Sequence, residues 1–183
     1  VISIKRDLIH VVKEKKEFVC TLRGSLLKEK SKQKNLIAVG DIVHFIICSE
    51  HEGVIVNIEE RYSILARQEA LKTKEQIIAV NIDQVFITTS VVKPHLKPTL
   101  IDRYIIAARK GDMQPIIVVN KIDLLKNHPE EKALLKAITK SYKAIDIPII
   151  CTSVQTKKGI KEIKKLMQNK ASVFSGQSGV GKS

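Results

Sequence analysis

The chain has 183 residues, and its 32 lysines and arginines against 19 aspartates and glutamates give a formal net charge of +13. Apolar residues make up 44% of it, which excludes an intrinsically disordered chain and fits one domain of common size or two small ones. No run approaches the roughly 18 apolar residues of a membrane span, and the N-terminus lacks a signal-peptide core, so we expect a cytoplasmic protein. Its three cysteines are odd in number and far apart, which predicts neither a disulfide framework nor a cysteine zinc site.

The first part of the chain carries the pattern of short β-strands separated by turns. Short strands at this spacing favour a small barrel, of the OB or SH3-like kind. We therefore predict an OB-like, RNA-binding barrel over residues 1–62 and a linker over 63–79. The strands are expected at 8–12, 18–22, 42–48 and 54–58.

Residues 5–34 hold ten bases against four acids, and their densest basic stretch, Lys28–Lys34, is expected to be a loop. A solvated loop explains such a run without any function. The functional interpretation is contact with RNA phosphates, because each neutralised phosphate releases counterions and gives salt-dependent affinity. The residues predicted to make this contact are Arg23, Lys28, Lys30, Lys32 and Lys34.

From residue 80 the pattern changes to strands that alternate with helices. The first helix is expected to open with a capping box formed by Thr99 and Asp102 and to end at Gly111. Continuous apolar strands between amphipathic helices indicate a parallel sheet, and hence an α/β domain over residues 80–183. The strands are expected at 85–92, 116–119, 148–151 and 171–174, and the other helices from Pro129 and Ile160.

The last eight residues match G-x-x-x-x-G-K-[ST], the phosphate-binding P-loop, at every fixed position. Its glycines let backbone N–H groups point at a phosphate, Lys182 brings a positive charge to the β- and γ-phosphates, and the Ser183 hydroxyl binds Mg²⁺. A predicted strand precedes the motif, as a P-loop requires; the alternative is a chance match. The predicted phosphate-binding residues are Gly176, Gln177, Ser178, Gly179, Val180, Gly181, Lys182 and Ser183.

The segment Asn120–Asp123, with the pattern N-K-x-D, follows the predicted strand 116–119. Ligands bind beyond the carboxyl ends of strands in open parallel sheets. The Asp123 carboxylate can accept hydrogen bonds from guanine N1–H and the 2-amino group, a donor pair that adenine lacks. The Asn120 amide can form a hydrogen bond on the O6/N7 side of guanine, and the aliphatic part of the Lys121 side chain can lie on the ring. A polar loop after a strand is the alternative.

A third segment, Cys151–Val154, follows the predicted strand 148–151. In guanine-nucleotide proteins the loop at this place supplies a backbone N–H to guanine O6, commonly from a Ser-Ala pair. Here the pair is Thr152-Ser153 or Ser153-Val154, and a plain surface loop is the alternative. The predicted guanine-binding residues are Asn120, Lys121, Asp123, Thr152 and Ser153.

The order of these motifs is unusual, because Asn120 precedes Gly176 by 56 residues whereas the P-loop comes first in ordinary GTPases. The chain resembles the RsgA family of circularly permuted GTPases, also called YjeQ or YloQ. The segments that carry the resemblance are Cys20–Gly24, Gly40–Val43, Asn81–Gln84, Ile101–Tyr104, Asn120–Leu125 and Val173–Ser183.

This resemblance implies a protein that binds GTP or GDP with Mg²⁺, hydrolyses GTP on the small ribosomal subunit and contacts ribosomal RNA during late subunit maturation. We expect a monomer without membrane contact. In the family the chain continues past the P-loop into switch segments, a D-x-x-G motif and a zinc module, none of which this sequence matches. We therefore expect a piece of a longer protein that holds no zinc ligand and does not hydrolyse GTP by itself.

Two other functions fit parts of the sequence. An ATP-using P-loop enzyme would make the N-K-x-D pattern coincidental and would bind ADP more tightly than GDP. A non-catalytic RNA-binding scaffold would bind RNA in a salt-sensitive way that is independent of nucleotide.

Overall fold

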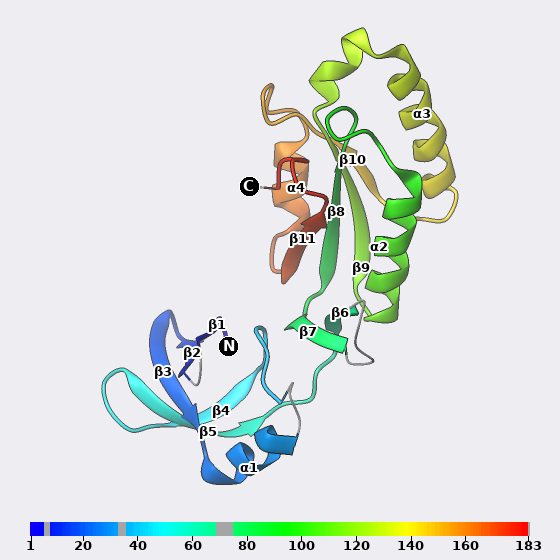
Figure 1. Ribbon diagram of the computed structural model, residues 1–183. Helices are drawn as coiled ribbons and strands as arrows, with labels where there is room; N and C mark the ends of the chain where they lie inside the picture. The colour runs from blue at the N-terminus through cyan, green and yellow to red at the C-terminus, as the bar shows by residue number, and fades with distance from the viewer. Residues whose placement is uncertain (6–7, 33–35, 69–74, 183) are drawn as a thin grey trace. The chain divides into compact units, whose positions relative to one another are not determined.

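Figure 1 shows the computed structural model of the chain, which describes residues 1–5, 8–32, 36–68 and 75–182. The chain divides into two units, Val1–Asn81 and Ile82–Ser183, and each is considered by itself. None of the described helices combines the length and the apolar character that crossing a lipid bilayer requires.

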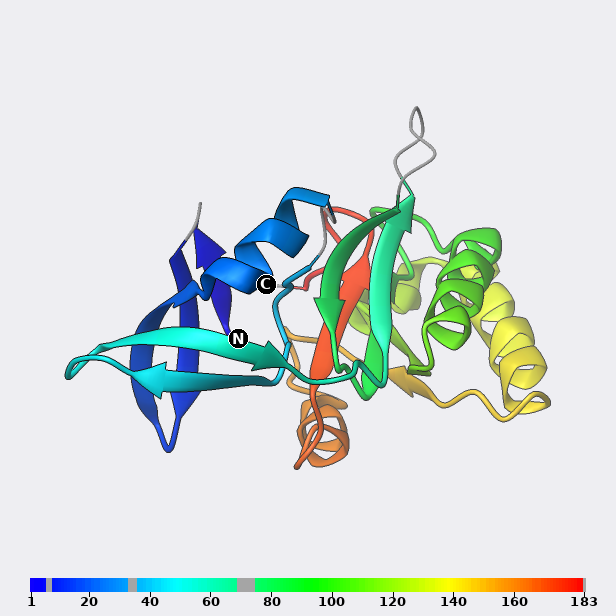
Figure 2. The same ribbon diagram turned by 90° about the horizontal axis from the view of Figure 1, so that it is seen from below.

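The first unit is built on a five-stranded sheet with the order β1-β2-β3-β5-β4, in which β3 and β5 are parallel and the other pairs antiparallel. A helix lies between β3 and β4 in the chain, and the strands curve strongly (Figure 2). This arrangement is that of an OB fold, in agreement with the predicted barrel. The elements are β1 (Ser3–Lys5), β2 (Leu8–Lys13), β3 (Lys16–Leu22), α1 (Gly24–Lys32), β4 (Val43–Ile47) and β5 (Glu52–Ile58).

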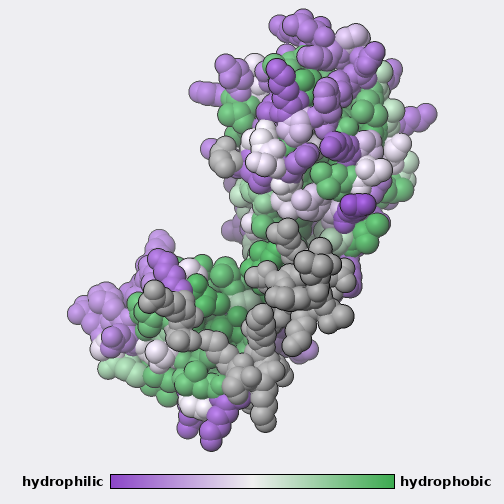
Figure 3. Space-filling model, viewed as in Figure 1, coloured by the Kyte–Doolittle hydropathy of each residue, from purple (hydrophilic) through white to green (hydrophobic). Residues whose placement is uncertain are grey.

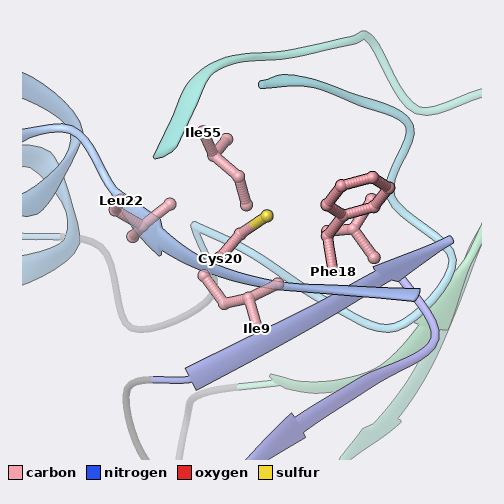
Figure 4. Packing of buried hydrophobic residues seen from close by; sticks show 6 residues of the cluster. Ile9, Phe18, Cys20, Leu22 and Ile55 are labelled. Carbon is pink, nitrogen blue, oxygen red and sulfur yellow. The ribbon is translucent and has the colours of Figure 1, made fainter. Parts of the chain in front are cut away.

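Alternate residues of these strands form the core of the first unit. Phe18, Cys20 and Leu22 of β3 point to the same side as Ile9 of β2, and Ile55 of β5 completes the cluster (Figure 4). All five are at most 5% exposed, as the two-residue period of a half-buried strand requires. Burial of this face is what holds the curved sheet together.

The basic stretch Lys28–Lys34 is not a loop as predicted, because α1 extends to Lys32. After Gly24 the sequence runs through leucine, lysine and glutamate, which are strong helix formers, without a further glycine or proline. Leu26 also packs against the core of the unit, which holds the helix on the barrel. Lys34 lies outside the described residues.

The segment 63–79, expected to be a linker, contains an antiparallel pair, β6 (Ile64–Gln68) and β7 (Glu75–Val80). The register shifts between Leu65 and Ala66, and such a bulge breaks the alternation of apolar and polar residues that would identify a strand in the sequence. The Val80 N–H donates to the Val39 carbonyl at 2.9 Å, which ties this pair to the rest of the first unit.

The second unit has a four-stranded, fully parallel sheet, as predicted, and its strand order is β10-β9-β8-β11. Helices α2 and α3 cover one face of the sheet and α4 the other (Figures 1 and 2). The elements are β8 (Gln84–Ser90), α2 (Pro98–Lys110), β9 (Gln114–Asn120), the 3-10 helix η1 (Ile122–Asn127), α3 (Pro129–Lys143), β10 (Ile149–Cys151), α4 (Ile160–Leu166) and β11 (Ser172–Gly176).

Apolar side chains on both faces of this sheet explain its continuous apolar strands. Phe86 of β8 stacks on its in-register neighbour Phe174 of β11, with ring centroids 4.8 Å apart, and both belong to a cluster with Ile163 of α4. On the other helices, Ile101 and Ile138 are nearly fully buried. A parallel sheet covered in this way has no solvated face.

The predicted capping box at Thr99 and Asp102 is wrong. Helix α2 begins at Pro98, after an N-cap at Lys97 that makes no side-chain capping hydrogen bond. Proline suits the first helical position because it fixes φ and has no N–H to satisfy. The Asp102 carboxylate instead accepts a hydrogen bond of 2.9 Å from the Tyr142 hydroxyl on α3.

Candidate functional site

The three sequence motifs meet at one edge of the sheet in the second unit. In the parallel register, Ser90 at the end of β8 lies opposite Asn120 at the end of β9, and Gly176 at the end of β11 lies opposite Thr88. Thr152 follows β10 and donates its N–H to the Val119 carbonyl at 2.7 Å. The carboxyl ends of all four strands therefore lie side by side, where open α/β sheets bind their ligands.

Asn120 joins these segments through its side-chain amide. Its Nδ2 donates to the Val180 carbonyl in the P-loop at 3.0 Å, and its Oδ1 accepts from the Thr152 Oγ1 at 3.3 Å. The side chain is only 4% exposed. Because a buried amide pays a desolvation cost for each unsatisfied atom, these bonds fix the P-loop against β9 and the loop after β10.

Two positions of the P-loop have to be glycine, because neighbouring atoms leave no room for a Cβ atom there. A Cβ on Gly181 (φ +90°) would lie 2.4 Å from Asn120 Nδ2, and one on Gly176 (φ +154°) would lie 2.0 Å from the Thr88 carbonyl oxygen. Both residues have backbone conformations that side-chain-bearing residues rarely adopt. The motif's glycines thus serve the packing of the loop as well as its curvature.

Lys121 spans from the N-K-x-D segment to the P-loop. It adopts a left-handed conformation (φ +63°), and its Nζ donates to the Gly179 carbonyl at 2.7 Å and also to the Lys93 carbonyl in the loop after β8. The aliphatic stem is thereby stretched along the edge of the site. A stem held at both ends presents a fixed apolar surface to a planar ring.

Asp123 lies at the start of η1, and one of its two carboxylate oxygens already accepts a hydrogen bond. Its Oδ1 accepts a hydrogen bond from the Ser153 hydroxyl at 2.5 Å, and this hydroxyl in turn accepts from the Thr156 N–H at 3.2 Å. Ser153 is fully buried. No described residue donates to Asp123 Oδ2, so the carboxylate has capacity for a donor pair from a ligand.

The loop after β10 leaves one backbone donor available. The Thr152 N–H is bonded to Val119 and the Ser153 N–H to the Lys158 carbonyl at 3.1 Å. The N–H of Val154 has no acceptor within the described part of the chain. Of the two pairs that the sequence left open, Ser153–Val154 therefore fits a donor to a ligand oxygen, and Val154 joins the predicted site residues.

The P-loop itself curls around a lysine. Lys182 Nζ donates to the Gly176 and Gln177 carbonyls at 3.1 and 2.9 Å. Gln177, Ser178 and Gly179 are exposed, whereas Val180 is buried and anchors the loop. Among the described residues no carboxylate pairs with Lys182, so its positive charge is available to an anion bound in the loop. Ser183 lies outside the described residues.

A cavity of about 270 Å³ lies on the α4 face of the sheet below the P-loop, and Lys182, Thr88 and Phe174 are among its lining residues. A larger cavity, of about 490 Å³, lies in the first unit between β2 and β4 and contains none of the predicted nucleotide residues. The strand edge of the second unit is the candidate nucleotide site, because polar groups from all three sequence motifs converge there.

Other reactive groups in the described residues offer no competing site. No three His, Cys, Asp or Glu side chains gather into a metal-binding group in this part of the chain. Burial raises the pKa of the Cys20 and Cys151 thiols, so both are neutral and weakly nucleophilic.

The predicted RNA-contacting residues lie in the first unit. Arg23 is exposed just before α1, and Lys28 is exposed on it. Lys30 and Lys32 lie within the helix, and Lys34 is outside the described residues. These positions are separate from the nucleotide motifs, all of which lie in the second unit.

Comparison with known proteins identifies relatives of this chain. The model of a family described as RsgA GTPase matches residues 58–183. The small ribosomal subunit biogenesis GTPase RsgA of Chlorobaculum parvum is 40% identical over 158 residues, which cover 81% of this chain and 49% of that protein. The protein of the same name from Geobacillus is 35% identical over the whole chain and 57% of its own length.

Two solved structures have the same fold. The crystal structure of YjeQ from Thermotoga maritima matches the whole chain with a TM-score of 0.81 at 30% identity, over 61% of its own length. That of YloQ, described as a circularly permuted GTPase, matches 99% of the chain with a TM-score of 0.76 at 29% identity, over 60% of its length. The chain spans about half the length of the curated relatives it matches.

Proposed function

The chain belongs to the RsgA GTPase family, and on that basis we propose that the protein it represents binds and hydrolyses GTP and acts in assembly of the small ribosomal subunit. The observation that carries the nucleotide part is the pair of hydrogen bonds that joins the N-K-x-D segment to the P-loop, from Asn120 to Val180 and from Lys121 to Gly179. They hold a base-binding group and a phosphate-binding loop on one edge of a sheet.

We propose that guanine is recognised by Asp123, Val154 and Lys121. The Asp123 carboxylate accepts from guanine N1–H and the 2-amino group, and Ser153 orients it. The Val154 N–H donates to O6, and the Lys121 stem lies on the ring. The Asn120 amide is largely engaged within the protein, so its main role is to position the P-loop, with one remaining N–H for the N7 side.

We propose that the P-loop N–H groups and Lys182 hold the β- and γ-phosphates. On nucleotide binding, Lys182 Nζ exchanges the Gly176 and Gln177 carbonyls for phosphate oxygens. Ser183 would hold a Mg²⁺ ion, which would neutralise charge at those phosphates. We assign no described residue to activating the attacking water.

The proposed partner is the small ribosomal subunit, on the name that the relatives carry. In this proposal the OB unit contacts ribosomal RNA through Arg23 and the lysines of α1, and the protein works as a cytoplasmic monomer. Zinc has no proposed site in this chain.

The test is the base preference of the chain for fluorescent GDP over fluorescent ADP. We expect GDP to bind at least tenfold more tightly, and Asp123→Ala to abolish that difference while leaving ADP binding unchanged. Tighter binding of ADP would identify an ATP-using enzyme and refute the proposal. Equal binding of the two nucleotides by the unmodified chain would refute guanine recognition.

A further inference from the structure

Helix α3 carries a row of four exposed lysines on one side, which we call the α3 lysine row. Its members follow one another at steps of four, four and three residues, and residues at these steps lie above one another on a helix. The row spans about 16 Å at 1.5 Å per residue. It consists of Lys132, Lys136, Lys140 and Lys143.

The helix is held rigidly with this row turned outward. Leu135, Ile138 and Tyr142 are buried on the opposite side, and the Tyr142 hydroxyl is bonded to Asp102 of α2. In Figure 3 hydrophilic residues dominate the part of the second unit that carries α3. The lysines therefore project from a helix that is packed on the unit, and not from a loop.

The surroundings of the row suit a chain of phosphates. None of the four lysines forms an ion pair with a described residue, and Glu131, which precedes the row, pairs with His95 at 2.7 Å. Beside the row lie the small exposed residues Ala133, Ala137 and Ser141, which allow a polyanion to approach the helix closely. A strand of B-DNA carries one phosphate per about 3.4 Å of axis, and the phosphates of A-form RNA follow one another at least as closely along the axis, so the row spans about five phosphates or more.

We infer that the α3 lysine row is an RNA-binding surface of the second unit that contacts the phosphate backbone of duplex RNA without reading its sequence. A membrane surface fits less well, because the apolar side of α3 is buried in the unit and cannot enter a bilayer. The inference deepens the proposed function and rests on it for the choice of RNA as polyanion.

The test compares two triple variants that remove equal charge from the same unit. Lys132, Lys136 and Lys140→Gln removes three of the four lysines of the row. Lys157, Lys161 and Lys165→Gln removes three exposed lysines in and near α4, where Glu162 interrupts the charge. Glutamine keeps the helix propensity of lysine, so both variants should fold. The probe is a 20-base-pair RNA hairpin, titrated by fluorescence anisotropy at several salt concentrations.

We expect the α3 variant to bind RNA at least tenfold more weakly and its salt slope to fall by about 2 to 3, roughly one for each lost phosphate contact. The α4 variant should lose less than threefold. Equal losses in both variants would show that net charge alone attracts RNA, and an unchanged α3 variant would show that the row is not used. Either result overturns the inference.

Binding to anionic vesicles and binding of GDP are measured on the same variants, to distinguish a membrane surface and a general loss of function from the loss of an RNA contact. Loss of binding to vesicles with 20% anionic phospholipid, with RNA binding kept, would overturn the inference in favour of a membrane. GDP binding should be unchanged in both triple variants, because none of these lysines lies in the nucleotide motifs. Failure of GDP preference in the unmodified chain would refute the proposed function, whereas failure of the RNA contrast alone would refute only this inference.

Discussion

The Asn120 side chain donates a hydrogen bond of 3.0 Å to the Val180 carbonyl, 60 residues later in the chain. Asn120 ends β9 and Val180 lies in the P-loop after β11, two strands that are not neighbours in the sheet, since β8 lies between them. The bond therefore makes the shape of the P-loop depend on the N-K-x-D segment. A motif order that differs from ordinary GTPases leaves this contact intact, because it depends on the sheet and not on the chain order.

Replacement of Asn120 by alanine should weaken GDP binding by tenfold or more. It removes the bond to Val180 and one of the two acceptors of Thr152 Oγ1, and the P-loop loses its fixed position against β9. Tenfold corresponds to about 1.4 kcal/mol, within the range for losing a buried hydrogen bond. The measurement is a titration with fluorescent GDP, and Asn127→Ala, an exposed residue at the end of η1, is the control. Equal affinity in the two variants would contradict the coupling.

Removal of the Ser153 hydroxyl should reduce the preference for GDP over ADP about fivefold to tenfold. The hydroxyl donates to Asp123 and is fully buried, so Ser153→Ala leaves that carboxylate free to turn away from the guanine edge. ADP binding should change little. The control is Ser141→Ala, whose hydroxyl donates to the Ala137 carbonyl on the exposed side of α3. A preference that is unaltered in Ser153→Ala would show that Asp123 needs no orienting group.

The second unit was predictable because its local signals agree with its tertiary structure. Continuous apolar strands such as 116–119 identify a buried parallel sheet, and the P-loop and N-K-x-D patterns follow such strands. The sequence does not show which backbone N–H groups are already hydrogen-bonded within the fold. Among the described residues the Val154 N–H has no acceptor whereas the Ser153 N–H has one, and this depends on the bridge between Ser153 and Lys158, which no local pattern specifies.

The first unit was less predictable, for two physical reasons. The bulge at Leu65 and Ala66 hides a strand, because it moves successive residues out of the two-residue period. A lysine-rich run does not by itself distinguish a loop from the exposed side of a helix, and the packing of Leu26 on the barrel core adds to the helix propensity of the segment. The capping box failed similarly, because the proline one residue earlier was the stronger helix start.

Gly40→Ala should destabilise the first unit by about 2 kcal/mol or more. Gly40 has φ +98°, and a Cβ there would lie 2.0 Å from the Val80 carbonyl oxygen, so the backbone must shift. The Asn81 side chain, which donates to the Gly40 carbonyl at 3.0 Å, would shift with it.

The measurement for Gly40→Ala is hydrogen exchange followed by mass spectrometry, read separately for residues 1–81 and 82–182. We expect faster exchange in the first range only, together with unchanged GDP binding. Gly24→Ala is the matched control, since a Cβ there meets no atom within 4 Å and alanine is a better helix former at the start of α1. Loss of protection in the control, or none in Gly40→Ala, would contradict the prediction.

Tyr142 should make the stability of the second unit depend on pH in the alkaline range. Burial, followed by the hydrogen bond to Asp102, raises the pKa of Tyr142 well above its usual value of about 10. The phenol is thus neutral in the folded state when it would already ionise in the unfolded chain. Its stabilising contribution is complete below pH 10 and is lost as the pH rises above that value, by up to about 1.4 kcal/mol per pH unit.

Urea unfolding of the unmodified chain and of Tyr142→Phe between pH 8 and 11 tests this directly. Below pH 10 the unmodified chain should be more stable by about 1 kcal/mol, the value of one buried hydrogen bond. Above pH 10 the difference should shrink and then reverse, because phenylalanine has no proton to lose. Titration of lysines and of the other tyrosines is common to both proteins and cancels in the difference. Tyr104→Phe on α2 is the control: its hydroxyl bonds to no described residue, so this variant should lose none of the 1 kcal/mol below pH 10. A difference for Tyr142→Phe that stays constant up to pH 11 would mean that this phenol ionises equally in both states.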